Sequence, residues 1–389
     1  MKILIKNANI VTPYEIKRSS SLVIEDGKII NICKGLCEDG SFDDIIDAEG
    51  NYLSPGFIDI HNHGNFGHDF MEATFEAFDI MADFHIKNGV TSFLATTITQ
   101  KDSAIRRALI SVGEYIESGS KDSKIKAQML GIYLEGPYFA VEKKGAQPEE
   151  YIKTPDIGEL KEFIDLSKNN IKIVALAPEI DGAKEAVRFL REKGITISAA
   201  HTVATYEEAK LGMDMGITLI THLYNGMRDF SHREPGIIGA ALTDERVACE
   251  LICDGIHLHV GAMELAVRMK GKDGIVLVSD AMMATGLEDG KYELGGQDVY
   301  VRDGAARLED GTLAGSTLTL DRAVYNMVHL VGVSLEDAVR MASLNPARVI
   351  GVERTKGSIE IGKDADLIVF DRDINILMAI VKGKVRNCR

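Results

Sequence analysis

The main pattern between about residues 56 and 351 is an alternation of short apolar runs with amphipathic stretches. The runs are rich in β-branched residues, as in strands that are buried on both faces. The stretches between them carry apolar residues at three- and four-residue spacing, and they predict helices, for example over 183–193 and 206–212. This order predicts repeated strand–helix units around a parallel sheet.

Eight apolar runs can be counted, and we expect each to form one parallel strand. Several begin just after a glycine, as at Gly89, Gly194 and Gly216, where a left-handed residue can end the preceding helix. Eight units over roughly 300 residues favour an α/β (β/α)8 TIM-type barrel, with a doubly wound open sheet as the alternative. The predicted strands span 57–61, 90–96, 128–135, 171–177, 195–201, 217–222, 248–252 and 275–280.

Both ends of the chain have a different pattern, with short strands separated by glycine turns. Neither end can bury a sheet face alone, so we expect the two to pair into one small β-sandwich domain. The predicted division is 1–54 plus 355–389 for this domain and 55–354 for the barrel. A β-hairpin insertion is expected near 292–311, where Gly-Gly and Asp-Gly pairs interrupt the rhythm, and a helix over 316–330 completes the last unit.

Composition and charge narrow the functional class. The chain has 389 residues, 45% of them hydrophobic and 26% charged, which is ordinary for a globular protein. Its 44 basic and 59 acidic residues give a net charge of −15, so neither nucleic acid nor an anionic membrane is expected as a partner. No long apolar segment resembles a secretory signal or a membrane span, and we expect a cytoplasmic protein.

The five cysteines form two pairs with C-x3-C spacing, Cys33 with Cys37 and Cys249 with Cys253, and Cys388 is left over. An odd count in a long chain is typical of reduced thiols. We therefore expect buried or incidental thiols here, without a zinc site.

Metal-binding residues follow several of the predicted strands. In a barrel of this kind the functional side chains lie at the carboxyl ends of the strands. A single histidine after an apolar strand is more often structural, so the joint placement carries the interpretation. The residues at these ends are His61, His63, Glu135, His201, His222 and Asp280.

These residue types indicate which cation the site would take. His61 and His63 are two residues apart, so they can point to the same side of a strand. Imidazoles combined with carboxylates suit one or two divalent ions, with Zn²⁺ favoured and Fe²⁺, Mn²⁺ or Co²⁺ as alternatives.

A divalent ion at this rim would make a nucleophile from water, so hydrolysis is the expected chemistry. Asp280, at the end of the last strand, is expected to take a proton from that water and pass it to the departing group. The alternative for Asp280 is a helix N-cap, which is less favoured because no clear helix follows it.

A second cluster has the chemistry of an anion site. Asn225 and Gly226 lie just beyond His222, and Arg233 follows in the sequence His-Arg-Glu-Pro-Gly. Small residues let the backbone approach an anion, and an arginine can bind phosphate through two parallel hydrogen bonds. Such loops are often only turns, but the position next to a candidate ligand favours a site. His257, after the seventh strand, could reach the same anion.

Several motifs resemble a known family. Pro-Gly-Phe-Ile-Asp-Ile-His-Asn-His-Gly at 55–64 resembles the opening strand of the amidohydrolase superfamily, and 357–367 resembles its closing β segment. Within that superfamily the chain is similar to the N-acetylglucosamine-6-phosphate deacetylases. The matching motifs occur in family order at 134–137, 143–146, 200–202, 221–227, 232–236, 254–257, 279–281 and 313–317.

The resemblance implies hydrolysis of the acetamide of N-acetylglucosamine 6-phosphate to glucosamine 6-phosphate and acetate, by a homodimer. By position, Glu135, His201 and His222 would hold the principal metal. His61 and His63 would hold a second ion bridged by Glu135, and Asp280 would be the catalytic acid and base. The implied substrate-binding residues are Asn225, Gly226, Arg233 and His257 for the phosphate, and Leu313, Ala314, Gly315 and Ser316 near the acetyl group.

One position departs from the family pattern. Gln147 occurs where the family usually has a histidine that contacts the amide carbonyl of the substrate. A glutamine can donate a neutral hydrogen bond but cannot become cationic, so polarisation of the carbonyl would fall more heavily on the metals. N-acetylgalactosamine 6-phosphate or another N-acyl sugar phosphate is therefore the alternative substrate. A non-catalytic assembly protein is the second alternative, disfavoured because every ligand position is filled.

Overall fold

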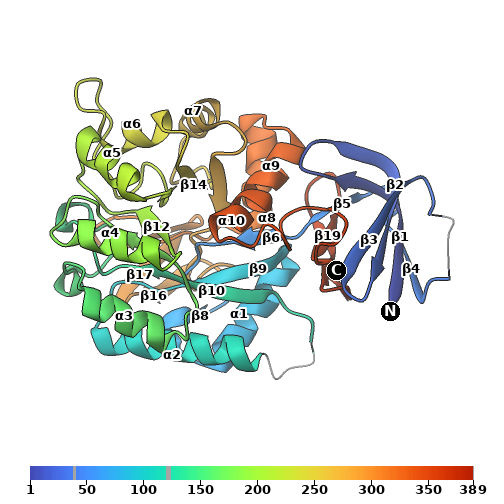
Figure 1. The fold of residues 1–389 in the computed structure, drawn as a ribbon, viewed down its shortest axis with the longest axis horizontal. Coiled ribbons are helices and arrows are strands. Elements are labelled where there is room, and N and C mark those ends of the chain that lie inside the picture. The colour runs from blue at the N-terminus through green and yellow to red at the C-terminus, as the bar shows by residue number, and fades with distance from the viewer. Residues whose placement is uncertain (38–40, 120–123, 389) are drawn as a thin grey trace.

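The structure is a computed structural model that describes residues 1–37, 41–119 and 124–388. Figure 1 shows a large body of helices around strands and, at its right-hand end, a smaller body made of strands alone. The N- and C-termini both lie in or beside the smaller body. The chain thus leaves the small body early, forms the large one, and returns.

Eight parallel strands form the sheet of the large body, in the order β15-β14-β13-β12-β11-β10-β9-β6. Their bounds are β6 (Phe57–Asp59), β9 (Val90–Thr96), β10 (Gln128–Glu135), β11 (Ile171–Leu176), β12 (Thr196–Ala199), β13 (Leu219–Ile220), β14 (Ala248–Ile252) and β15 (Ile275–Val278). Neighbours in the sheet are successive in the chain. The Asp280 N–H also donates to the His61 carbonyl (2.9 Å) just beyond the first and last strands, so the sheet nearly closes. This confirms the predicted (β/α)8 barrel and excludes the doubly wound sheet, whose strand order reverses.

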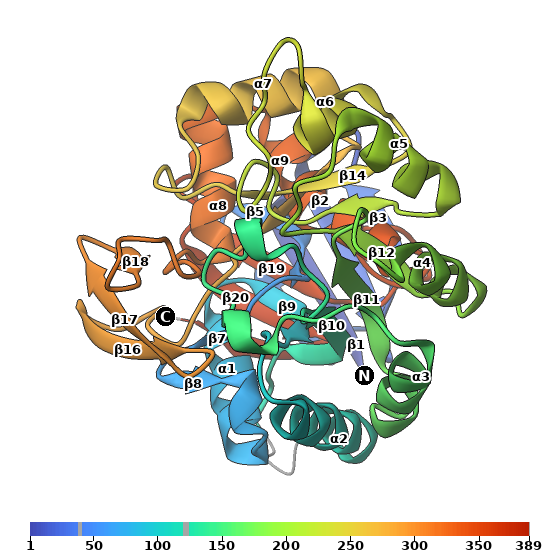
Figure 2. The same ribbon diagram turned by 90° about the vertical axis from the view of Figure 1, so that its left-hand side faces the viewer.

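Helices surround the barrel on its outside, as Figure 2 shows from the open end. The buried residues of α4, Ala183, Ala186, Val187 and Leu190, follow the three- and four-residue spacing that predicted this helix. The helices are α1 (Phe75–Lys87), α2 (Asp102–Ser118), α3 (Ile157–Leu166), α4 (Ala183–Glu192), α5 (Tyr206–Met215), α6 (Gly236–Thr243), α7 (Val260–Lys270), α8 (Leu320–Asn326), α9 (Leu335–Ala342) and α10 (Leu344–Val349).

The helix predicted over 316–330 is shorter than expected. It begins at Leu320 as α8, and a π-helical turn over Met327–Val331 ends it. Ser316 is held away from the helix because it forms a parallel bridge to Ala281, and its N–H donates to the Asp280 carbonyl (2.7 Å). The segment before α8 is therefore tied to the rim of the barrel.

The small body is one sheet in the order β21-β20-β19-β5-β1-β2-β3, with β4 paired to β1. The two ends of the chain meet where β19 pairs antiparallel with β5, as predicted. The sheet curls around its own apolar core. As a result β3 comes back toward the segment before β19, where a bridge joins Lys28 to Asp364. The strands are β1 (Lys2–Val11), β2 (Ile16–Glu25), β3 (Lys28–Lys34), β4 (Asp44–Asp47), β5 (Tyr52–Pro55), β19 (Leu367–Phe370), β20 (Ile376–Val381) and β21 (Lys384–Asn387).

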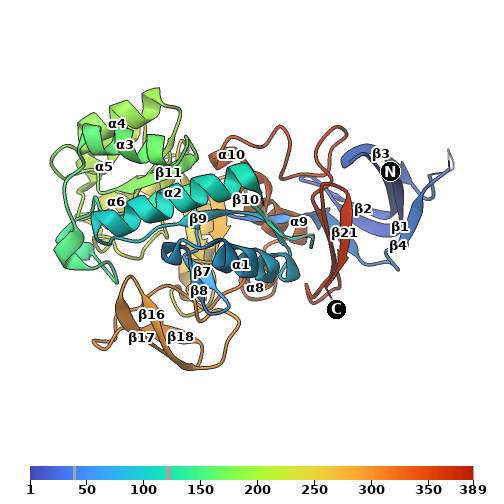
Figure 3. The ribbon, with the colours of Figure 1, turned by 90° about the horizontal axis from the view of Figure 1, so that it is seen from below.

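A further antiparallel sheet stands beside the open end of the barrel, where the sequence predicted a hairpin. It has three strands, β16 (Gly290–Leu294), β17 (Gln297–Arg302) and β18 (Ala305–Arg307). Figure 3 shows it projecting from the barrel on the side opposite α3 and α4. The division of the chain at 54/55 and 354/355 stays a prediction, supported by the membership of β5 in one sheet and β6 in the other.

One prediction about the cysteines is wrong. Cys33 and Cys37 form a disulfide, where the sequence predicted reduced thiols. Gly35 between them has a φ of 74°, and this left-handed turn brings their Cα atoms to 5.5 Å. Cys249 and Cys253 are free and buried, as predicted. Within the described part of the chain, none of the helices combines the length and the apolar character needed to cross a membrane.

Candidate metal centre

The six predicted ligands converge at the open end of the barrel. Glu135 Oε1 lies 3.3 Å from His222 Nε2 and 3.5 Å from His201 Nε2. It also lies 3.5 Å from His61 Nε2, and the other carboxylate oxygen of Glu135, Oε2, lies 3.3 Å from His63 Nε2. Asp280 Oδ1 completes the cluster, 3.3 Å from His63 Nε2 and 3.6 Å from His61 Nε2. None of the six side chains belongs to a residue more than 7% exposed.

Two groups can be distinguished within this cluster. Glu135, His201 and His222 offer three ligand atoms that all lie within 4.8 Å of one another, and His61, His63 and Asp280 offer three more. Glu135 contacts imidazoles of both groups, through Oε1 to one and through both oxygens to the other. The geometry therefore fits two neighbouring ions that share one carboxylate.

The backbone leaves the extended conformation at three of the ligands. His201, His222 and Asp280 have φ values of 44°, 30° and 48°, in the left-handed region that residues other than glycine rarely adopt. Such conformations cost on the order of 1–3 kcal/mol each and collect at functional sites. They also explain why the strands β12, β13 and β15 each end two residues before these ligands, where the sequence predicted strands that include them.

Hydrogen bonds fix which nitrogen of two imidazoles carries the proton. His201 Nδ1 lies 2.9 Å from the Lys143 carbonyl oxygen, and His222 Nδ1 lies 3.1 Å from that of Asn225. A carbonyl oxygen can only accept, so each Nδ1–H donates and each Nε2 presents a lone pair.

The lone pairs face one another. The two Nε2 atoms are 3.3 Å apart, with a carboxylate oxygen of Glu135 beside both. His61 Nε2 is buried and has no hydrogen-bond partner among the described residues. Electron-pair donors arranged in this way repel unless a cation lies between them, so the side chains fit a divalent metal ion.

The charges of the cluster point the same way. Burial alone would lower the pKa of His61, but the negative charges of Glu250, Glu135 and Asp280 outweigh it and raise that pKa to about 9. Burial would raise the pKa of Glu135 and Asp280, yet the surrounding imidazoles hold both below their ordinary values. The buried carboxylates are thus stabilised by positive charge beside them, and a divalent cation bound between the side chains would provide that charge.

The sequence analysis missed Glu250. It is fully buried in β14, and its Oε2 lies 2.8 Å from His61 Nδ1 and 3.2 Å from the His222 backbone nitrogen. It missed Asp59 as well, which is buried under the site and accepts a hydrogen bond from Ser279 Oγ (2.6 Å). A single acidic residue inside an apolar strand is the signal that could have found both.

A pocket of about 170 Å³ lies over the cluster. Six of the predicted substrate-binding residues line it: Gln147, Asn225, Gly226, His257, Leu313 and Gly315. Ala314 and Ser316 are buried and do not line it, and Ser316 Oγ donates to the Ser279 carbonyl (2.6 Å). Arg233 is exposed on the loop before α6 and does not line it either. The substrate roles of all nine residues stay predictions.

Gln147 contacts a ligand of the metal centre. Its Nε2 donates to Glu135 Oε2 (2.9 Å), and its Oε1 accepts from the Thr99 N–H (2.9 Å). The residue is only 4% exposed, so its amide is held on both sides. The contact expected from the sequence was with substrate; the contact in the structure is with the carboxylate that lies between the two groups of ligands.

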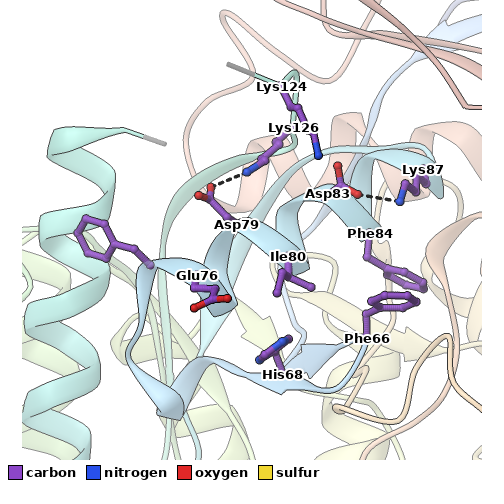
Figure 4. Close-up of a pocket in the computed structure, with 11 residues that line it drawn as sticks. Phe66, His68, Glu76, Asp79, Ile80, Asp83, Phe84, Lys87, Lys124 and Lys126 are labelled. Atoms are coloured by element: carbon purple, nitrogen blue, oxygen red, sulfur yellow. Dashed lines mark ion pairs between the residues drawn. The ribbon is translucent and has the colours of Figure 1, made fainter. Parts of the chain in front are cut away.

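A larger pocket, of about 650 Å³, lies on the outer surface of α1 (Figure 4). Two ion pairs line this pocket, Lys126 with Asp79 (2.9 Å) and Lys87 with Asp83 (2.7 Å). His68 also lines this pocket. None of the six candidate ligands does, so the chemistry belongs to the barrel mouth.

Comparisons with known proteins identify the family of this chain. The amidohydrolase family matches residues 52–386. The chain is 39% identical over 386 residues to the N-acetylglucosamine-6-phosphate deacetylase of Lysinibacillus sphaericus, covering 99% of this chain and 98% of that protein. It is 40% identical over 341 residues to the N-acetylgalactosamine-6-phosphate deacetylase of Escherichia coli O157:H7, covering 88% and 89%. The crystal structure of the N-acetylglucosamine-6-phosphate deacetylase from Pasteurella multocida superposes with a TM-score of 0.93 at 35% identity, and the match covers 100% of both chains.

Proposed function

Because the chain belongs to the amidohydrolase family, and within it to the N-acetylglucosamine-6-phosphate deacetylases, we propose that it hydrolyses N-acetylglucosamine 6-phosphate to glucosamine 6-phosphate and acetate. The observation that carries the proposal is the convergence of six metal-type side chains under a pocket at the barrel mouth. Amide hydrolysis needs an activated water and a polarised carbonyl, and such a site can provide both.

The metal is assigned to the two groups of ligands. Glu135, His201 and His222 would hold one divalent ion, and His61 and His63 would hold a second with the adjacent carboxylates. A divalent ion, when bound, lowers the pKa of water and polarises a carbonyl oxygen. The nitrogen-rich ligand set favours Zn²⁺, with Fe²⁺, Mn²⁺ and Co²⁺ as alternatives.

Asp280 is proposed as the group that moves the proton. The imidazoles outweigh burial and hold its pKa below the ordinary value, so it is ionised at neutral pH and can accept a proton from the attacking water. It then gives that proton to the amide nitrogen as the carbon–nitrogen bond breaks. The products are the amine of the sugar and acetate.

The remaining pocket residues are proposed to hold the substrate. Asn225, Gly226 and His257 would face the phosphate, with the His257 imidazole backed by Asp254 (Nδ1 to Oδ2, 2.7 Å). Leu313 and Gly315 would contact the acetyl group from the loop whose other residues, Ala314 and Ser316, are buried against the barrel rim.

Acetate release from purified protein tests the proposal. We expect a higher kcat/KM for N-acetylglucosamine 6-phosphate than for unphosphorylated N-acetylglucosamine. Preference for the unphosphorylated sugar would contradict the anion site, and no release from any acylated sugar would revive the non-catalytic alternative.

A second substrate is favoured by two observations. One relative at 40% identity is named an N-acetylgalactosamine-6-phosphate deacetylase, and Gln147 replaces the usual histidine of the family. A side-by-side measurement of kcat/KM on the two epimers decides which sugar is preferred.

A homodimer and a cytoplasmic location are also part of the proposal. Light scattering coupled to size-exclusion chromatography, and fractionation of the source cells, would test them.

A further inference from the structure

Glu250 is a buried carboxylate in an otherwise apolar strand, and its burial costs free energy. It is the only charged residue of β14, it is 0% exposed, and its strand neighbours Cys249 and Leu251 are fully buried. Removing a carboxylate from water costs several kcal/mol unless a positive charge and hydrogen bonds compensate for it. An apolar residue at this position would avoid the free-energy cost of burying a charge. The interactions that compensate for this cost must therefore come from the site that Glu250 faces.

The contacts of Glu250 are directed at the metal centre. Its Oε2 accepts from two donors, His61 Nδ1 (2.8 Å) and the backbone N–H of His222 (3.2 Å). Its Oε1 is buried and has no hydrogen-bond partner among the described residues. Both hydrogen bonds of the Glu250 side chain that the structure shows therefore go to residues that carry candidate ligands.

His61 differs in this respect from the other imidazoles. The Nδ1 atoms of His201 and His222 donate to neutral backbone carbonyls, and His63 Nδ1 has no partner within the described residues. Of the four, His61 is the one whose Nδ1 donates to a carboxylate. A charge-assisted bond is stronger than a neutral one, fixes the ring more tightly, and makes the far nitrogen a better electron donor.

We propose that Glu250 is a positioning residue that keeps the proton of His61 on Nδ1 and directs the Nε2 lone pair toward His63 and Asp280. Glu250 thereby sets the affinity of the group His61, His63 and Asp280 for a second divalent ion. The inference rests on the proposed function and adds to it a selective role for one side chain. The ion at Glu135, His201 and His222 depends on it much less, because the ring nitrogens of that group are fixed by backbone carbonyls.

The test is the Glu250→Gln variant, titrated with Zn²⁺ under buffered free-metal conditions. A glutamine can place its amide oxygen where Oε2 lies and accept from both donors, so the geometry is kept while the charge is lost. We expect the full-length wild type to bind two Zn²⁺ per chain. In the variant, one of the two affinities should fall by about 10- to 100-fold while the other stays within a few-fold.

Asp254→Asn is the matched control. Asp254 also backs an imidazole, that of His257, from the same segment of chain, but outside the two groups of ligands. It should leave both Zn²⁺ affinities unchanged, even where it alters the KM for the sugar phosphate.

A readout on the metal-free protein separates positioning from a purely structural role. Without metal, Glu250→Gln keeps an acceptor for both donors, so the variant should still unfold in one cooperative transition, with a lower melting temperature because His61 loses its ion-pair partner. The rise in melting temperature on adding Zn²⁺ should be smaller in the variant. Loss of the cooperative transition without metal, or an equal fall in both Zn²⁺ affinities, would show a structural role and overturn the inference.

Two further outcomes separate this inference from the proposed function. A variant that binds both ions as tightly as the wild type, or a wild type that releases acetate but binds only one Zn²⁺ per chain, overturns the role of Glu250 and leaves the deacetylase intact. A selective loss of one ion in a protein that releases no acetate from any sugar phosphate supports Glu250 and overturns the function.

Discussion

His85 is predicted to make the protein lose stability in mild acid. It lies on α1 behind the metal centre, where its Nε2 is 3.0 Å from the side-chain oxygen of Asn62 and its ring stacks on Phe93 at 4.6 Å. Asn62 lies in sequence between the candidate ligands His61 and His63. Burial lowers the pKa of His85 to about 3, so the folded protein keeps the imidazole neutral and donating to Asn62.

The sign and size of the effect follow from proton linkage. The unfolded chain takes up a proton at its ordinary pKa of about 6.5, and the folded chain resists it until about pH 3. Stability from this residue is therefore full above pH 6.5 and is lost as the pH falls toward 3. Between pH 7 and pH 5 the loss is about 2 kcal/mol, and it depends almost entirely on the unfolded-state pKa because the folded-state pKa lies well below 5.

The assay is urea unfolding of wild type and His85→Gln at pH 7 and pH 5, with the same free-metal concentration in every sample. A glutamine keeps a donor for Asn62 but does not titrate in this range. We expect the wild type to lose about 2 kcal/mol more than the variant between the two pH values. Other titrating groups cancel in this double difference. Equal losses in the two proteins would refute a buried neutral imidazole at this position.

Three further changes have definite expected outcomes. Asp280→Asn should lower kcat by about 10² or more while elemental analysis shows the metal content of the wild type, and near wild-type turnover would remove Asp280 from proton transfer. Gln147→Ala removes the hydrogen bond to Glu135 Oε2, so calorimetric titration should show metal binding weakened by about 10-fold or more; unchanged binding would confine Gln147 to substrate contact. Asp366→Ala removes the nearer of the two carboxylates beside the buried Lys356 ammonium, leaving only Asp364 at 3.5 Å, and should lower the unfolding free energy by about 3 kcal/mol in denaturant titrations, whereas a loss under 1 kcal/mol would contradict a buried ion pair.

The strands that lie wholly within the barrel wall were predictable from the sequence. β9, β10 and β14 begin and end at the predicted residues, because each is a mainly apolar run bounded by turn residues. β12, β13 and β15 were predicted too long. The last residues of these predicted strands, His201, His222 and Asp280, are candidate ligands with left-handed backbone that no propensity for extended structure would predict.

The candidate ligands were predictable because they recur at one structural position, the carboxyl end of a strand. Glu250 was missed because it lies in the middle of a strand, and its contact with His61 depends on how the closure of the barrel brings β14 opposite that residue. The orientation of Gln147 toward Glu135 likewise depends on how the 141–151 loop folds over the mouth. The Cys33–Cys37 disulfide was missed because the compartment, on which the expectation of reduced thiols relied, cannot be derived from local sequence.

The central claim is that these six side chains form one metal centre that hydrolyses an acylated sugar phosphate. The most direct measurement follows acetate release from N-acetylglucosamine 6-phosphate and bound metal on the same samples, as a chelator removes the metal and Zn²⁺ is then added back. The account predicts that turnover falls in step with metal content and returns with it. Undiminished acetate release from protein shown to contain no metal would contradict it.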